Sequence, residues 1–122
     1  MKESSGTILV VDDDAVARQL LADALRKDGY DVEIAGGGAD AIAALDRAKR
    51  FDVVLTDIRM GEVDGLAVLR EFRQRSPETA IVLLTAFGSM DGAVEAIKQG
   101  AYDYLAKPFR KEDIKLVVRR SL

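Results

Sequence analysis

Short apolar runs alternate along the chain with segments whose apolar residues recur every three or four positions. The runs predict β-strands at Thr7–Val11, Asp31–Ala35, Phe51–Thr56, Ala80–Thr85 and Tyr102–Ala106. Three of them contain the uninterrupted apolar stretches ILVV, VVL and IVLL, which are typical of strands buried on both faces of a sheet.

The segments with helical spacing predict five α-helices, one after each strand. The first ends near Gly29, the second covers about residues 39 to 49, the third follows Asp64 as N-cap and ends before Pro77, and the fourth ends near Gly100. Apart from the alanine-rich second helix, their apolar stripes are Ala17, Leu20, Leu21, Ala24 and Leu25; Leu66, Leu69 and Phe72; Met90, Ala93, Val94 and Ile97; and Ile114, Val117, Val118 and Leu122.

Strict alternation of strands and helices predicts an α/β fold in which a five-stranded parallel sheet is doubly wound, with helices on both faces. The length of 122 residues fits one domain that spans residues 1–122. Sheets of this kind bind ligands at the carboxyl ends of their strands, so the residues that follow each strand are the candidates for a site.

Four of the five strands end in polar residues of matching chemistry. Asp12 and Asp13 follow the first strand, Asp57 follows the third, Thr85 closes the fourth and Lys107 follows the fifth. Carboxylates brought within about 4 Å would repel one another by roughly 4 kcal/mol per pair at an effective dielectric constant near 20. An all-oxygen set of this kind favours Mg²⁺ or Mn²⁺, and an aspartate beside a metal and a lysine is suited to accept a phosphoryl group.

Composition narrows the chemistry further. The chain has no cysteine and no histidine, which excludes thiol nucleophiles, imidazole bases and zinc fingers. The net charge of −3 with both signs interspersed argues against direct contact with nucleic acid. No apolar run is long enough to cross a membrane and no secretory leader is visible, so a cytoplasmic location is expected.

The motifs ILVVDDD, VVLTDIRMGEVDGL, IVLLTA and GAYDYLAKPF, at these spacings, resemble those of the receiver domain of two-component response regulators over essentially the whole chain. The stretch TAFGSMDGAVEAIKQGAYDYLAKPF looks most like receivers of NtrC-type, sigma-54-dependent activators. This resemblance implies a flavodoxin-like fold and a chain that is the N-terminal part of a longer regulator of transcription, whose effector domain is absent here.

The resemblance also implies roles for individual residues. Asp57 matches the residue that accepts a phosphoryl group from a sensor histidine kinase, and Lys107 and Thr85 match the residues that contact this group. The metal ligands would be Asp12, Asp13, Asp57 and the main-chain carbonyl of Arg59, and the metal Mg²⁺. The domain would be a switch, and no enzyme beyond its own phosphotransfer and autodephosphorylation.

Further implied features concern the response to phosphorylation. Thr85 and Tyr104 match the switch pair, and a homodimer through the face formed by residues 90–122 is expected. Pro108 would follow a cis peptide bond. The chain departs from the family at Gly61, where proline is usual.

Two alternatives remain open. The stretch from Gly36 through Gly38 to Ala41 fits G-x-G-x-x-A after a strand, and Asp57 lies at about the distance expected of a dinucleotide-binding fingerprint. A receiver that binds a partner without being phosphorylated is the second. Asp14 is expected to cap the first helix rather than to hold metal.

Overall fold

The computed structural model describes residues 6–47, 50–60, 62–85 and 90–122. Its strands are β1 Thr7–Val11, β2 Asp31–Ala35, β3 Val53–Asp57, β4 Ala80–Thr85 and β5 Asp103–Ala106. Its helices are α1 Ala15–Lys27, α2 Gly38–Asp46, α3 Gly65–Arg75, α4 Met90–Lys98 and α5 Lys111–Ser121. Every predicted strand and helix is present, although several bounds differ.

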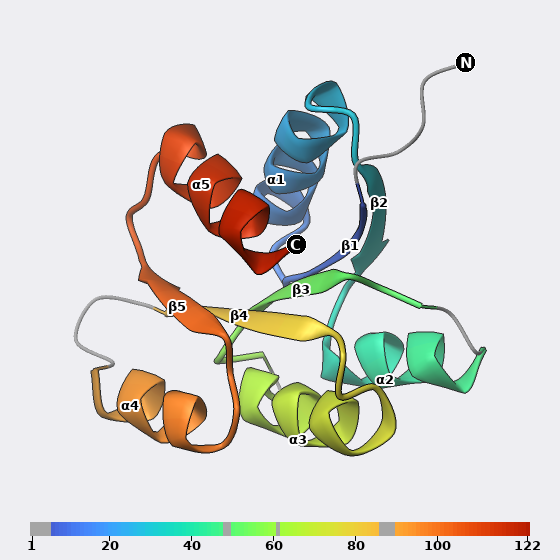
Figure 1. Ribbon diagram of the computed structural model, residues 1–122, viewed down its shortest axis with the longest axis vertical. Helices are drawn as coiled ribbons and strands as arrows, with labels where there is room; N and C mark the ends of the chain where they lie inside the picture. Colours follow the sequence, from blue (N-terminus) through green and yellow to red (C-terminus); the bar gives the residue numbers. More distant parts are fainter. Residues whose placement is uncertain (1–5, 48–49, 61, 86–89) are drawn as a thin grey trace.

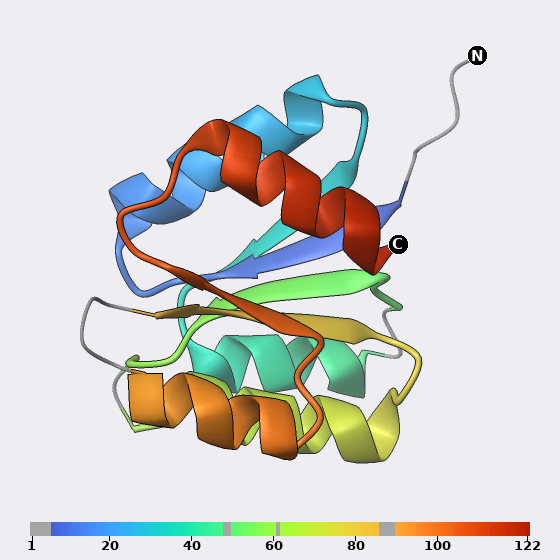
Figure 2. The same cartoon turned by 60° about the vertical axis from the view of Figure 1, so that its left-hand side comes forward.

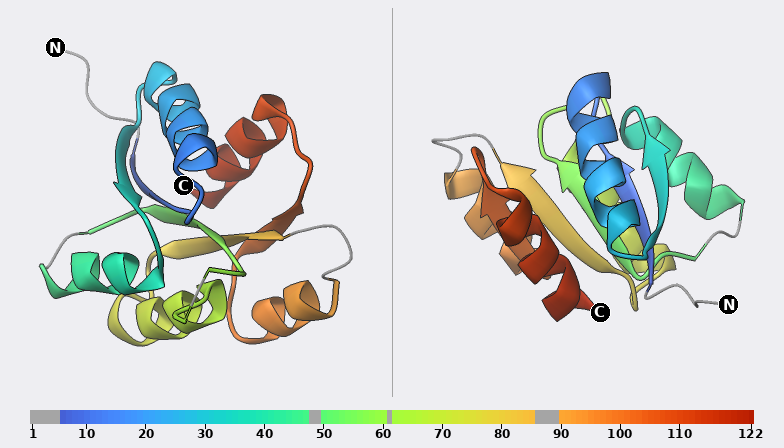
Figure 3. Two further views of the ribbon diagram at one scale, coloured as in Figure 1. Left: turned by 180° about the vertical axis from the view of Figure 1, so that it is seen from behind. Right: turned by 90° about the horizontal axis from the view of Figure 1, so that it is seen from above.

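The strands form one parallel sheet in the order β2-β1-β3-β4-β5. Helices α1 and α5 cover one face, while α2, α3 and α4 cover the other (Figures 1 and 2). The views from behind and from above show the same three layers (Figure 3). The predicted doubly wound α/β fold is therefore confirmed.

Successive side chains of a β-strand point to opposite faces of the sheet. Alternate residues of each strand therefore belong to two separate apolar cores. Leu9, Val11 and Val54 pack with α2, α3 and α4, which we call the lower core. Ile8 and Val10 belong to the upper core, with α1 and α5. Because both faces of the central strands are covered, these strands are apolar except near their ends.

The two strands with revised bounds begin later than predicted. Phe51 is buried but precedes β3, and Asp52 joins the neighbouring strand ends through its backbone, donating to the Thr7 carbonyl at 2.8 Å and accepting from the Ala80 amide at 3.0 Å. β3 extends to Asp57, one residue further than predicted. β5 begins at Asp103 rather than at Tyr102.

The residues predicted to begin and end helices lie at the expected positions. The Asp14 carboxylate accepts hydrogen bonds from the amides of Val16 and Ala17, and the Asp64 carboxylate accepts one from Ala67. Gly29 follows the end of α1 with a φ of 93°, a left-handed conformation that residues other than glycine rarely adopt. Asp14 is therefore a helix cap, as predicted.

The apolar stripes are only partly buried. Leu20 of α1 is 60% exposed, and Val94 and Ile97 of α4 are 48% and 41% exposed. Ala96, which was not in the predicted stripe, is fully buried, because it belongs to the lower core between α4 and the sheet. In the part of the chain that the structure describes, no helix is long and apolar enough to span a membrane.

Candidate functional site

Parallel pairing brings the predicted site residues to one edge of the sheet. Val11 of β1 pairs with Thr56 of β3, so Asp12 and Asp57 follow at the same level. Asp57 pairs with Leu84, and Thr85 pairs with Ala106, directly before Lys107. The carboxyl ends of β1, β3, β4 and β5 thus converge although their residues lie far apart in the sequence.

The centre of this edge is an ion pair between Lys107 and Asp57. The Lys107 Nζ donates to Asp57 Oδ2 at 2.6 Å, and the two side chains are 35% and 13% exposed. The peptide bond that follows Lys107 is cis, as the resemblance implied. The backbone amide of Lys107 donates to the Thr85 carbonyl at 2.7 Å, which fixes the start of this turn.

Asp12 is almost completely buried, with 2% of its surface exposed. Its Oδ1 accepts from the Asp14 amide at 2.9 Å, and its own amide donates to the Ala35 carbonyl at 3.2 Å. Burial raises the pKa of Asp12; the Asp14 amide and the charge of Lys107 oppose this, whereas the charges of Asp57 and Asp13 add to it. Burial and the neighbouring carboxylates therefore disfavour the ionised form of Asp12 more than the Asp14 amide and Lys107 favour it.

Lys107 remains protonated in the same environment. Burial is the largest single effect and would lower the pKa of Lys107, but the hydrogen bond that Lys107 donates to Asp57 and the charges of Asp57, Asp12 and Asp13 together outweigh burial, so the pKa is raised. The site is thus a group of carboxylates partly neutralised by one ammonium group.

The predicted metal ligands differ in how they are placed. Asp12 and Asp57 lie on the sheet edge, whereas Asp13 and Arg59 are exposed on the loops that follow β1 and β3. Among the described residues, no three acidic side chains are already arranged to hold a metal ion. Mg²⁺ commonly takes only one or two carboxylates and keeps several waters, so oxygen donors of this kind fit it. Gly61 lies outside the described residues.

The predicted switch residues share the lower core. Thr85 is 3% exposed and follows Ile81 and Leu83, which belong to that core, in strand alternation. Tyr104 is half-buried, packs against the same core and pairs with Leu83 in the neighbouring strand. Thr85 and Tyr104 are therefore placed two residues apart on one face of adjacent strands.

The loop after β3 packs directly against the glycine-rich turn before α2. A Cβ added at Gly38 would collide with the main-chain oxygen of Val63, so this glycine allows the loop after β3 to approach closely. The neighbouring cavity of about 360 Å³ is lined by two acidic residues, Asp13 and Glu62. A pyrophosphate would be repelled there, and the dinucleotide alternative loses its support.

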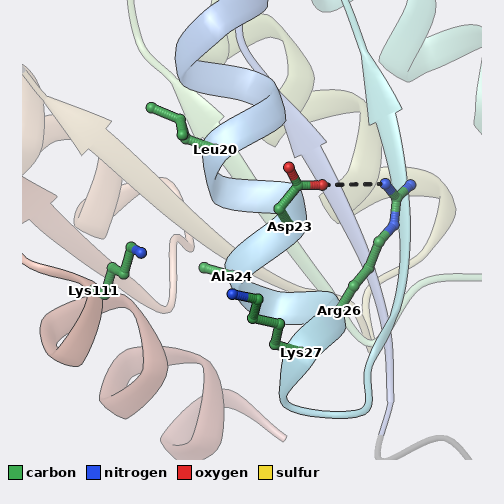
Figure 4. Close-up of a pocket in the computed structure, with 6 residues that line it drawn as sticks. All are labelled: Leu20, Asp23, Ala24, Arg26, Lys27 and Lys111. Carbon is green, nitrogen blue, oxygen red and sulfur yellow. Dashed lines mark ion pairs between the residues drawn. The ribbon is translucent and has the colours of Figure 1, made fainter.

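A groove runs from the site between α1 and α5. Asp12 and Lys107 lie at one end of a cavity of about 250 Å³ whose other lining residues are mainly apolar, among them Leu20, Leu21 and Phe109. Leu20 also borders the adjoining pocket in Figure 4, whose lining includes the basic residues Arg26, Lys27 and Lys111 and the acidic Asp23. An exposed apolar surface with a charged, mainly basic rim thus adjoins the acidic site.

Sequence reasoning missed two residues at this site. Arg18 of α1 donates from Nη1 to the main-chain oxygen of Asp12 at 2.8 Å. Gly65 begins α3, and an added Cβ would collide with the main-chain oxygen of Asp57. The only sequence signal for Arg18 was its place in the first turns of the helix after Asp12, because helical side chains lean towards the N-terminus.

The chain is similar to known regulators over most of its length. It is 45% identical over 115 residues to the transcriptional regulatory protein ZraR of Salmonella typhimurium, which covers 94% of this chain and 26% of that protein. It is 41% identical over 117 residues to the DNA-binding transcriptional regulator NtrC of Escherichia coli, covering 96% of this chain and 25% of that protein. The chain spans about a quarter of the length of these relatives.

Solved structures agree with this similarity. The crystal structure of the receiver domain of NtrX from Brucella abortus matches with a TM-score of 0.88 and 38% identity, covering 94% of this chain and 97% of that one. The family model described as the response regulator receiver domain matches residues 8–119. The chain therefore belongs to the response regulator receiver domain family, and its relatives confirm the resemblance to receivers of NtrC type.

Proposed function

We propose that this domain is a phosphorylation-controlled switch in which Asp57 accepts a phosphoryl group from the phosphohistidine of a sensor kinase. The observation that carries the proposal is the 2.6 Å contact between Lys107 Nζ and Asp57 Oδ2, beside the buried Asp12. A lysine in this place holds the carboxylate and offers a positive charge to a dianionic group that arrives there.

The reaction requires an oxygen of Asp57 to attack the phosphorus atom. The bond between phosphorus and the partner's imidazole nitrogen breaks, its electron pair returns to that nitrogen, and an acyl phosphate forms on Asp57. Lys107 then pairs with the new phosphoryl oxygens, and the Thr85 hydroxyl is the second group we assign to them. Autodephosphorylation by water at the same site reverses the state.

We assign Asp12, Asp13, Asp57 and the main-chain carbonyl of Arg59 as the groups that hold Mg²⁺. The metal, or Mn²⁺ in its place, would neutralise the charge that develops on the transferred phosphoryl group. The raised pKa of Asp12 supports this assignment. Burial and the charges of Asp57 and Asp13 destabilise the ionised Asp12 more than Lys107 stabilises it, so a bound cation would stabilise the ionised form further.

The groove between α1 and α5 supports the choice of a protein as phosphoryl donor. Val16 and Leu20 are 69% and 60% exposed on the helix that starts at the site. A kinase that delivers a phosphoryl group to Asp57 must approach this edge, and the two apolar side chains with the nearby basic residues would give it a contact surface.

Phosphorylation would change the packing of side chains next to the lower core. Thr85 borders both the site and the lower core, so we propose that its movement towards the phosphoryl group lets Tyr104 turn inward. The face formed by residues 90–122 would then dimerise, and Val94, Tyr102 and Leu116, each about half exposed, lie on it. A transcriptional output through an effector domain, in the cytoplasm and without nucleic acid contact by this domain, completes the proposal.

The test is phosphorylation by a small-molecule donor. The domain is incubated with acetyl phosphate and Mg²⁺, and its intact mass is recorded beside that of Asp57→Asn. We expect a gain of one phosphoryl group that requires Mg²⁺ and is absent from the variant.

A matched control comes from another ion pair of the same length. Arg75 Nη2 and Asp46 Oδ1 are also 2.6 Å apart, but on the protein surface, so Asp46→Asn should be phosphorylated like the wild type. If the wild type gains no mass and also fails to bind beryllofluoride, the remaining alternative is a receiver that acts without phosphorylation, and the proposal is wrong.

A further inference from the structure

Arg18 of α1 contacts the acidic end of β1 through the main chain of Asp12. Its Nη1 donates to the main-chain oxygen of Asp12 at 2.8 Å, and the residue is partly buried. An added Cβ at Gly36 would lie 3.3 Å from the same nitrogen, so the β2–α2 turn packs over the arginine. The side chain is held between two loops that border the site.

Asp12 is thereby fixed at three points. Its amide donates to Ala35 at 3.2 Å and its Oδ1 accepts from the Asp14 amide at 2.9 Å. Its carbonyl oxygen accepts from Arg18, the only one of these partners that acts through a side chain. The peptide that leads from Asp12 to Asp13 therefore depends on Arg18 for its orientation.

We propose that Arg18 is a positioning residue that orients the Asp12–Asp13 peptide and so prepares both carboxylates to bind Mg²⁺. The inference rests on the proposed function for the identity of the metal. It adds a residue that would touch neither the metal nor the phosphoryl group, but acts through the backbone of a ligand.

If Arg18 acted only through its charge, it would weaken Mg²⁺ binding. A guanidinium group repels a divalent cation, so its removal would strengthen Mg²⁺ binding if electrostatics were its only effect. If Arg18 positions the carboxylates, its removal weakens binding despite this relief. The sign of the change in affinity therefore distinguishes the two roles.

The chain offers a matched control on the same helix. Arg26 Nη2 donates to the main-chain oxygen of Val32 at 2.8 Å, at the end of α1 far from the site. Arg18→Met and Arg26→Met thus remove the same charge and the same kind of hydrogen bond. Mg²⁺ affinity is measured by calorimetric titration at constant ionic strength, and amide hydrogen exchange of Asp14 is measured without metal.

We expect Arg18→Met to raise the Kd for Mg²⁺ about tenfold, the lower end of the loss typical for a partner that supports a metal ligand. Exchange at the Asp14 amide should become faster, while Arg26→Met leaves both values unchanged. Arg18→Lys, which keeps the charge and one donor, should fall between the wild type and Arg18→Met, and it replaces Arg18→Met if that variant does not fold.

Unchanged or tighter Mg²⁺ binding by Arg18→Met would overturn the inference, as would equal effects of the two methionine variants. A wild type that binds no Mg²⁺ would instead refute the metal part of the proposed function. In that case the Asp14 exchange rates still decide whether Arg18 holds Asp12 in place.

Discussion

The ion pair between Lys107 and Asp57 allows a quantitative test of how the fold changes the strength of an interaction. The perturbation is a double-mutant cycle made of Lys107→Met, Asp57→Asn and the double variant, each unfolded by denaturant at neutral pH without Mg²⁺. The coupling energy from this cycle isolates the interaction between the two side chains from their other contacts.

The structure sets the expected magnitude. Unit charges 2.6 Å apart attract by about 6 kcal/mol at an effective dielectric constant of about 20 and by about 1.6 kcal/mol in water. Asp57 is 13% exposed, but Lys107 is 35% exposed, so solvent screens the pair considerably. We therefore expect a coupling energy of about 2 kcal/mol, towards the lower of these limits.

A second cycle serves as the control for burial. Arg75 and Asp46 are also 2.6 Å apart, but their side chains are 37% and 64% exposed. Because solvent screens exposed ion pairs and most contribute little, we expect a clearly smaller coupling in this cycle. Equal coupling energies in the two cycles would show that placement on the sheet edge does not strengthen the Lys107–Asp57 pair, and the reasoning would fail.

Other predictions concern the surroundings of this pair. Burial raises the pKa of Asp12, so its ionisation destabilises the folded state: Asp12→Asn should be more stable than the wild type at neutral pH, and the difference should shrink as the pH falls through the folded-state pKa towards the ordinary value of 3.8. A difference that does not depend on pH in denaturant titrations would contradict this. Gly65→Ala places a Cβ against the Asp57 carbonyl, so we expect a loss of about 1–3 kcal/mol of stability and slower phosphorylation by acetyl phosphate, whereas Gly37→Ala, which meets no atom within 4 Å, should have neither effect. Asp14→Ala removes the cap of α1 and should lower the free energy of unfolding by about 1 kcal/mol while phosphorylation continues; loss of phosphorylation would mean that Asp14 belongs to the site.

The order and type of the secondary structure elements followed from the sequence because apolar spacing differs between buried strands and helices. The bounds were less well predicted at β3 and β5. Asp52 could not be identified as a connector from its type, since its role depends on Thr7 and Ala80, which only the sheet brings near. Likewise, exposure of Leu20 depends on which side of α1 meets the sheet.

The sequence by itself determined which residues could form the site, because parallel strands deliver their carboxyl ends to one edge. It predicted that Asp12, Asp57 and Lys107 lie together at this edge and that Asp14 caps a helix, and the structure places them so. Only the tertiary structure decided that Lys107 pairs with Asp57 across 50 positions and that Asp12 is buried deeply enough to raise its pKa.

Contacts with the main chain were decided by the tertiary structure alone. Arg18 binds the carbonyl of Asp12, and Gly38 and Gly65 admit the backbone of Val63 and Asp57. Every residue carries a carbonyl group, so no residue type in the sequence marks the one that will be bound or approached. Such contacts become visible only when the folded chain places a particular arginine or glycine against a particular peptide.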